Sequence, residues 1–200
     1  MLRRFVKNEK GFTGLEAAIV LIAFVTVAAV FSYVLLGAGF FATQKSQEVV
    51  HTGVKQATSS MEIVGSIVAI GNTTNNNVTN VTFTLQLAAG GQPIDLNKTL
   101  ITVLVPVDGT FKELTYQANS SILDDKTEYL VKWIYALQTP PDNYLEEFEK
   151  AEVTVYLEAA GFDVDPNDNF IIEVKPPIGA AYPIELKAPP SIDEVMVLLR

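Results

Sequence analysis

The residues with the clearest chemical signature lie where a basic leader meets a long apolar run. Four basic residues and one acidic residue precede Gly11, and the chain then continues as FTGLE into the run. A processing site at this junction would leave the apolar run on the mature protein. Glu16 places a carboxylate at the start of that run. Inside a bilayer, a charge without a partner costs several kcal/mol. The simplest role of Glu16 is to stabilise the helix start through the helix dipole, worth ~0.3–1 kcal/mol.

Five Asn-x-Ser/Thr triplets form a second group of residues with possible chemistry. None has proline in the middle, and three lie within the segment GNTTNNNVTNVT. In an exported domain this pattern marks a candidate acceptor for N-glycosylation. Because asparagine also favours turns, a structural role in a loop is the alternative for each triplet. We expect at least one occupied site among Asn72, Asn77, Asn80, Asn97 and Asn119.

A third group lies in the acidic segment 163–169. Asp163, Asp165 and Asn167 follow the D-x-D-x-N spacing that opens a calcium-binding loop. The pattern then departs, because Asp168 stands where the loop needs glycine and Val174 where it needs the closing glutamate. We therefore expect an acidic hairpin turn here, with a weak calcium site as the alternative.

Composition narrows the classes of function. The chain has no cysteine and one histidine, His51, which excludes thiolate chemistry, disulfides and multi-histidine metal sites. The sequence motifs of phosphate-binding loops, dinucleotide folds, serine hydrolases and zinc proteases are absent. Residues 12–200 carry 10 basic and 22 acidic side chains, which argues against nucleic acid as a partner. We expect neither enzymatic activity nor a cofactor.

The element that must position the N-terminal groups is a run of 28 uncharged residues, 17–44. The run exceeds the ~20 helical residues that span a bilayer. Apolar side chains occur on every face, so this helix belongs in a membrane or in the core of an assembly. A secretory signal peptide would have a shorter run with a small-residue cleavage site behind it. A simple membrane anchor fits the length, and a cytoplasmic leader would place residues 45–200 outside the cell.

The segment GFTGLEAAIVLIAFVTVAAVFSYVLLGAGFFATQKSQEVVHTGV resembles the N-terminal helix of archaeal flagellins (archaellins) in the order of its residues. The resemblance covers residue 11 to about residue 60. It implies a class III signal peptide over residues 1–11, similar to that of type IV pilins. A membrane-embedded prepilin peptidase would then cut between Gly11 and Phe12. Glu16 would become the fifth mature residue and would pair during assembly with the new α-amino group of Phe12, in its own chain or a neighbouring subunit.

The same resemblance implies a function and a set of partners. The mature chain would polymerise into the archaellum, the rotating extracellular filament with which archaea swim. Residues 12–60 would anchor the subunit in the cytoplasmic membrane and later form the filament core, and residues 61–200 would form the outer wall. The implied partners are further copies of the chain, the prepilin peptidase, and the archaellum export and motor machinery. Members of this family are commonly N-glycosylated.

Periodicity predicts an α+β fold. Apolar residues at helical spacing extend the N-terminal helix from about Thr13 to about Ser60. Beyond residue 61, apolar and polar residues alternate, which predicts strands separated by Asn, Asp, Gly and Pro clusters. We expect an antiparallel sandwich or barrel, and the resemblance implies an immunoglobulin-like sandwich. The segment Pro141–Lys150 is expected to make a short helical turn. The expected strands cover residues 63–70, 81–87, 101–105, 129–137, 153–157, 170–174, 182–187 and 195–199.

Two other functions fit part of the sequence. An adhesive type IV pilin would have the same leader, apolar helix and N-terminal glutamate, although the exact sequence TGLEAAIVLIAFV favours a flagellin. A membrane-anchored β domain that binds a ligand outside the cell would keep its leader and stay a monomer in detergent. The N-terminus of the mature protein separates these readings.

Overall fold

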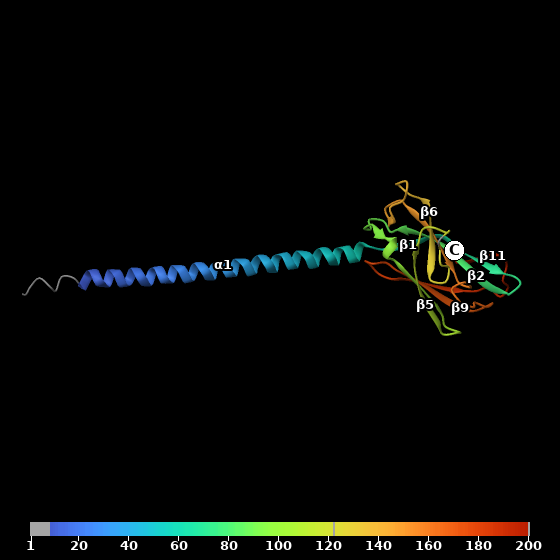
Figure 1. Ribbon diagram of the computed structural model, residues 1–200, viewed down its shortest axis with the longest axis horizontal. Helices are drawn as coiled ribbons and strands as arrows, with labels where there is room; N and C mark the ends of the chain where they lie inside the picture. The colour runs from blue at the N-terminus through green and yellow to red at the C-terminus, as the bar shows by residue number, and fades with distance from the viewer. Residues whose placement is uncertain (1–8, 122, 200) are drawn as a thin grey trace, which may run out of the picture. The chain divides into compact units, whose positions relative to one another are not determined.

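The computed structural model describes residues 9–121 and 123–199, and the chain divides into two units at Thr52/Gly53. The first element is α1, which runs without a break from Glu9 to Thr58 (Figure 1). The predicted helix is therefore confirmed, with both ends a few residues earlier in the chain than expected. Its long run of Ala, Leu, Ile, Val and Phe supports it, and Lys55 in the last turn complements the helix dipole.

The C-terminal unit is a β domain, and all eight predicted strands are present in its described residues. Three further strands (β3, β5 and β7) were not predicted. The elements are β1 (Met61–Asn72), β2 (Asn77–Leu87), β3 (Ile94–Asp95), the 3-10 helix η1 (Leu96–Lys98), β4 (Leu100–Val105), β5 (Thr110–Gln117), β6 (Glu128–Tyr135), β7 (Tyr144–Leu145), β8 (Lys150–Tyr156), β9 (Asn169–Lys175), β10 (Tyr182–Lys187) and β11 (Val195–Leu199).

Nine of these strands are hydrogen-bonded in the order β10-β9-β4-β5-β6-β8-β2-β1-β11. Strand β5 links two parts of this order, because residues 110–114 pair with β4 and residues 115–117 pair with β6. The β5–β6 pair is parallel, whereas the other neighbours are antiparallel. The expectation of an antiparallel domain is thus confirmed for all pairs but this one, which arises because β5 passes from one set of strands to the other.

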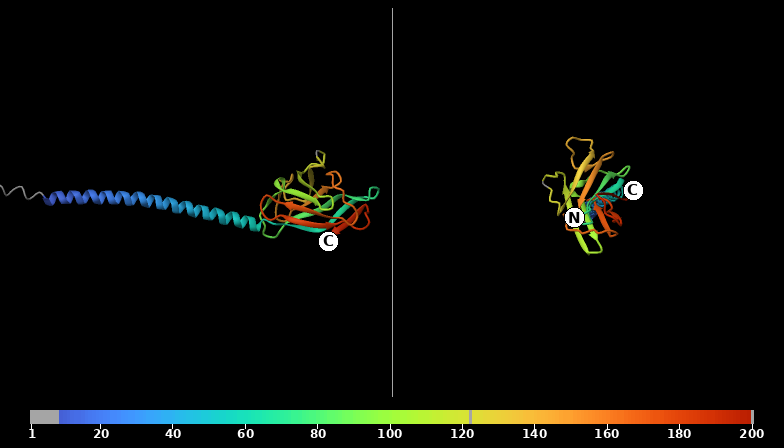
Figure 2. Two further views of the ribbon diagram at one scale, coloured as in Figure 1. Left: turned by 90° about the horizontal axis from the view of Figure 1, so that it is seen from below. Right: turned by 90° about the vertical axis from the view of Figure 1, so that its right-hand side faces the viewer.

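Both sets of strands bury one face in the same core. In β2, Phe83 and Leu85 are buried while the residues between them are half-buried, the alternation expected of a strand with one inward face. Val103 of β4 and Ile172 of β9 belong to the same buried cluster. The strands therefore wrap around one hydrophobic core (Figure 2). A long helix followed by a mostly antiparallel β domain confirms the α+β class.

The segment Pro141–Lys150 is not helical, so that prediction was wrong. It contains the two-residue strand β7, and Leu145 of that strand is fully buried. Asn143 and Phe148 have φ angles of 68° and 71°, which an α-helix does not tolerate. The spacing of apolar and acidic residues resembled a helical turn, but the burial of Leu145 bends the chain into a tight loop instead.

The chain enters the β domain through a closely packed junction at Ser59, which is 3% exposed. The Ser59 N–H donates to the Lys55 carbonyl at 2.9 Å, and the Ala88 N–H donates to the Ser60 carbonyl at 3.0 Å. Gly179, in the loop before β10, has a φ of 108°. A Cβ at this glycine would overlap the carbonyl oxygen of Ser59 and lie 3.0 Å from its carbonyl carbon. Only glycine fits against this backbone.

Candidate assembly surface

Helix α1 presents apolar side chains to solvent around its whole circumference. Among the described residues, nineteen large hydrophobic side chains between Leu15 and Val54 are 55–80% exposed. Burying one such side chain contributes about 1.5–3 kcal/mol, so the surface as a whole represents on the order of tens of kcal/mol. The helix is long and apolar enough to cross a membrane. A surface of this kind is stable only against lipid or against other apolar helices.

Two polar groups within this apolar run, both threonine hydroxyls, are satisfied by the helix itself. The Thr26 hydroxyl donates to the Ala23 carbonyl at 2.9 Å, and the Thr43 hydroxyl donates to the Gly39 carbonyl at 2.8 Å. Neither hydroxyl needs water, so both are compatible with an apolar environment. Around Gly37 and Gly39, no atom lies within 4 Å of the place where a Cβ would stand. A neighbouring helix backbone can therefore approach closely at these positions.

Glu16 lies on this surface at the beginning of the apolar run. It is exposed and lines a shallow depression together with Val20, Leu21 and Phe24. Among the described residues, no cation forms an ion pair with its carboxylate. The backbone at Gly11–Phe12 is helical, whereas the Phe12 side chain and residues 1–8 of the predicted leader lie outside the described part. An apolar helix surface with one carboxylate at its rim suits an assembly in which a partner supplies the positive charge.

The five predicted glycosylation sequons occupy different environments in the β domain. Asn72 ends β1, Asn77 and Asn80 lie in β2, Asn97 lies in η1, and Asn119 lies between β5 and β6. Asn97 and Asn119 are exposed, and Asn72 and Asn80 are half-buried. Asn77 is only 7% exposed. The sequence pattern does not distinguish these sites, but the fold does.

The acidic segment 163–169, for which we expected a hairpin turn with a calcium site as the alternative, is a turn with side-chain hydrogen bonds within the segment and to Asn77. Asp163 accepts a hydrogen bond from the Asn77 amide at 3.2 Å, and Asp168 accepts one from the Asp165 N–H at 3.2 Å. Asn167 has a φ of 70°, typical of asparagine in a turn. The described residues contain no group of three or more His, Cys, Asp or Glu side chains that could hold a metal ion. The turn is not a hairpin, since β8 and β9 are not paired with each other.

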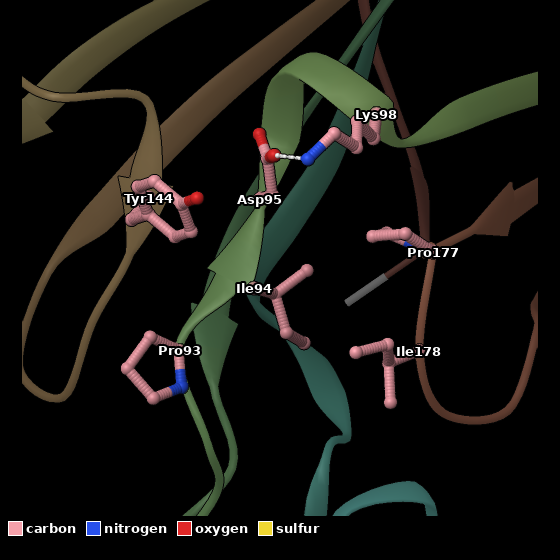
Figure 3. Close-up of a pocket in the computed structure, with 7 residues that line it drawn as sticks. All are labelled: Pro93, Ile94, Asp95, Lys98, Tyr144, Pro177 and Ile178. Atoms are coloured by element: carbon pink, nitrogen blue, oxygen red, sulfur yellow. Dashed lines mark ion pairs between the residues drawn. The ribbon is translucent and has the colours of Figure 1, made fainter.

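The β domain also has a hollow of about 270 Å³ beside η1 (Figure 3). Lys98 Nζ lies 2.9 Å from Asp95 Oδ2, and this hydrogen-bonded ion pair raises the pKa of Lys98. The two charges neutralise each other, and the remaining lining is Pro93, Ile94, Tyr144, Pro177 and Ile178. The two charged groups among these described lining residues are therefore paired with each other.

A family model decides the identity of the chain. The model for archaeal-type flagellin matches residues 11–186, which include most of α1 and most of the β domain. The chain belongs to the archaeal-type flagellin family. The resemblance predicted from the N-terminal segment is thereby confirmed, and for this flagellin the match extends well beyond that segment.

Known relatives of this flagellin have similar lengths and a similar fold. "Probable flagellin 1" of Archaeoglobus fulgidus is 81% identical over 200 residues and covers 98% of each chain. "Probable flagellin 2" of the same organism is 44% identical over 201 residues, covering 94% of each. The structure of the archaeal flagellum of Methanospirillum hungatei strain JF1 contains a chain that is 33% identical, with a TM-score of 0.73. That comparison covers 94% of this flagellin and 99% of the other chain.

Two buried polar residues that shape the β domain of this flagellin were not predicted. Glu149 is 3% exposed and accepts hydrogen bonds from the N–H groups of Leu137 (2.7 Å) and Glu146 (3.0 Å). Tyr129 is 1% exposed, and its hydroxyl donates to the Thr99 carbonyl at 2.8 Å. Burial raises the pKa of Tyr129 above its ordinary value. The sequence carries no signal for Glu149, since charged residues at a loop usually lie in water.

Proposed function

We propose that this flagellin is a structural subunit of an extracellular archaellum filament. The observation that carries the proposal is the exposed apolar surface of α1, in a chain whose family forms such filaments. Copies of α1 would pack together in the filament core, and the β domains would form the outer wall. The chain itself would contribute no catalysis, bind no cofactor and have no nucleic-acid partner. Its motion would come from a motor at the base of the filament.

The proposal includes processing by a prepilin peptidase between Gly11 and Phe12. Residues 1–11 would then be a class III signal peptide, residues 12–60 the anchor and later the filament core, and residues 61–200 the outer domain. The 28 uncharged residues 17–44 amount to about 42 Å of helix, which exceeds the ~30 Å hydrocarbon thickness of a bilayer. Before assembly, α1 would hold the subunit in the cytoplasmic membrane. Export and motor components of the archaellum would be its other partners.

Glu16 would take part in assembly once Phe12 is the N-terminus. A separation of four residues along a helix is about 6 Å, close to one turn, so an α-amino group at Phe12 would lie beside the carboxylate. In the filament the amino group of a neighbouring subunit could take the same place. Such a pair would offset the cost of bringing the carboxylate into apolar surroundings. The pairing would also set the axial register between neighbouring helices.

The test is to shear filaments from the cells that make the protein, pellet them and determine the N-terminus by mass spectrometry. We expect chains that begin at Phe12. Chains that begin at Met1 and occur only in the membrane fraction would refute both processing and polymerisation. Swimming assays on a deletion strain then separate a motility filament from an adhesive one.

A matched pair of variants tests the role of Glu16. Glu16→Gln removes the charge at the start of the apolar run, whereas Glu48→Gln removes an exposed carboxylate on the same helix, next to Lys45. Loss of one partner of a desolvated charge pair costs about 2–5 kcal/mol, so Glu16→Gln should lower the yield of pelleted filaments at least tenfold. Glu48→Gln should change the yield little, because an exposed ion pair contributes about 0–1 kcal/mol. Equal yields for the two variants would contradict an assembly role for Glu16.

A further inference from the structure

We infer that the fold selects among the five sequons, with Asn119 as the principal N-glycosylation acceptor and Asn72 as the second. In the transfer, asparagine Nδ2 forms a bond to C1 of a sugar carried on a lipid phosphate. The bond between C1 and the phosphate oxygen breaks, the amide loses a proton, and the lipid phosphate leaves. The reaction therefore needs the asparagine amide at the surface, and recognition of the sequon needs its Ser/Thr hydroxyl there as well. The inference rests on the proposed export of the β domain.

In the sequon at Asn77, both the asparagine amide and the Thr79 hydroxyl are hydrogen-bonded within the β domain. The Asn77 side chain is 7% exposed, and its Nδ2 donates to Asp163 Oδ1 at 3.2 Å. The hydroxyl of Thr79 donates to the Ile70 carbonyl at 2.8 Å. Modification would require breaking both hydrogen bonds and pulling Asn77 out of β2. A sugar on Nδ2 would not fit in the buried space that the amide occupies.

The sequon at Asn97 is closed at its hydroxyl. Asn97 is exposed, but Thr99 is only 1% exposed and its hydroxyl donates to the Asp95 carbonyl at 2.9 Å. The same Asp95 accepts a hydrogen bond from the Asn97 N–H at 3.1 Å through its carboxylate. The 3-10 helix η1 is therefore fixed at both ends of the sequon, and Thr99 cannot turn outward without unfolding it.

The sequon at Asn80 is held in the middle of the sheet. Asn80 pairs with Ile70 of β1 on one side and with Tyr156 of β8 on the other. Thr82 is half-buried, and its hydroxyl lies 3.4 Å from the Thr154 hydroxyl. A strand hydrogen-bonded on both sides cannot bend to present its side chains to another protein without losing ladder hydrogen bonds.

The remaining two asparagines make the same local hydrogen bond, Asn119 in an exposed turn and Asn72 at the last residue of β1, where it pairs with Asn77. The side-chain oxygen of Asn119 accepts the N–H of Ser121 at 2.9 Å, and that of Asn72 accepts the N–H of Thr74 at 2.9 Å. In each case the oxygen makes the local hydrogen bond, and no described residue bonds to the amide nitrogen, which is the reacting atom. Asn119 and Ser121 are both exposed, whereas Asn72 is half-buried beside an exposed Thr74. Because of this difference in exposure, we expect a higher glycan occupancy at Asn119 than at Asn72.

Glycopeptide mapping of the full chain from its producing cells tests the inference. Trypsin isolates Asn119 in the peptide 113–126, whereas the other four sequons share the peptide 56–98 and need fragmentation to be told apart. We expect the highest occupancy at Asn119, a lower occupancy at Asn72 and none at the other three. An unmodified peptide 113–126, or a glycan at Asn77 or Asn97, would overturn the inference.

Variants separate loss of the acceptor from loss of the fold. Asn119→Gln and Ser121→Ala should each remove the glycan mass from 113–126, whereas Ser121→Thr should keep it. Asn77→Gln should leave the glycan mass of the chain unchanged. Loss of the glycan in Ser121→Thr would contradict a sequon-based site. If glycosylated chains are found but never in pelleted filaments, the proposed filament function fails and the site assignment stands.

Discussion

Replacement of Gly179 by alanine is predicted to destabilise the β domain strongly, and the reason lies at the junction with Ser59. Two costs combine at this position. The φ of 108° is a conformation that a residue with a Cβ rarely adopts, and the strain costs about 1–3 kcal/mol. The new Cβ would also overlap the Ser59 carbonyl oxygen and lie 3.0 Å from the carbonyl carbon. Overpacking of this kind costs about 1–3 kcal/mol more.

The surrounding hydrogen bonds prevent an easy relaxation. The Ser59 N–H is bonded to the Lys55 carbonyl, and the adjacent Ser60 carbonyl accepts from Ala88. The backbone at Ser59 therefore cannot shift without disturbing α1 or the start of β1. We expect a total loss of about 2–6 kcal/mol for Gly179→Ala, a large part of the ~5–15 kcal/mol that stabilises an ordinary domain.

Gly65→Ala is the matched control. Gly65 has a φ of 84°, but no atom lies within 4 Å of its missing Cβ. The control therefore measures the conformational strain without the steric overlap, and we expect a loss of about 1–3 kcal/mol. The difference between the two variants isolates the contact with Ser59.

Fluorescence of Trp133 is the appropriate assay. It is the only tryptophan of the chain and packs against the core of the β domain, so its fluorescence reports the unfolding of that domain. Denaturant unfolding of the full chain in detergent gives the free energy of unfolding for each variant. If Gly179→Ala and Gly65→Ala agree within about 0.5 kcal/mol, the tight packing at Ser59 is refuted.

Three further predictions follow from the same structure. Glu149→Ala should lower the free energy of unfolding by about 2–4 kcal/mol, because it leaves two backbone N–H groups without an acceptor. The control Glu147→Ala, at an exposed position, should lower it by less than about 0.5 kcal/mol. Denaturant unfolding measures both variants. Tyr129→Phe should lose about 1–2 kcal/mol at pH 7. Because burial raises the pKa of Tyr129 above its ordinary 10.0, the wild-type chain loses stability above pH 10 as its unfolded state ionises. Between pH 10 and 11, the difference in free energy of unfolding between the wild type and Tyr129→Phe should therefore shrink by up to about 1.4 kcal/mol per pH unit. A difference that stays constant would contradict a raised pKa of Tyr129 in the folded state. Phe24→Ala should reduce the yield of pelleted filaments, since Phe24 is 76% exposed in the single chain. It should not change the unfolding curve of the β domain that Trp133 fluorescence reports. A shifted unfolding curve would count against a role of Phe24 confined to assembly.

The strands that the sequence predicted differ from β5, one of the three that it missed, in how much of each strand is buried. In β8, Ala151, Val153 and Val155 are buried and the residues between them are half-buried. The sequence therefore shows the alternation of residues that predicts a strand. In β5, Leu114 is the single buried residue, because this strand crosses between two sets of strands with little of its surface covered. A strand held by its backbone pairing leaves no hydrophobic pattern to detect.

The sequence by itself determined the long apolar helix, the basic residues before it, the carboxylate at Glu16 and the family. These features depend on the order and local period of residues, and a helix satisfies its own backbone wherever it lies. Only the tertiary structure decided which sequons are open, how the segment 141–150 folds and why Gly179 must be glycine. For Asn77 and Gly179 the deciding contacts come from residues distant in the chain, Asp163 and Ser59. Burial and steric fit are set by such contacts, so they become visible only once the strands are packed.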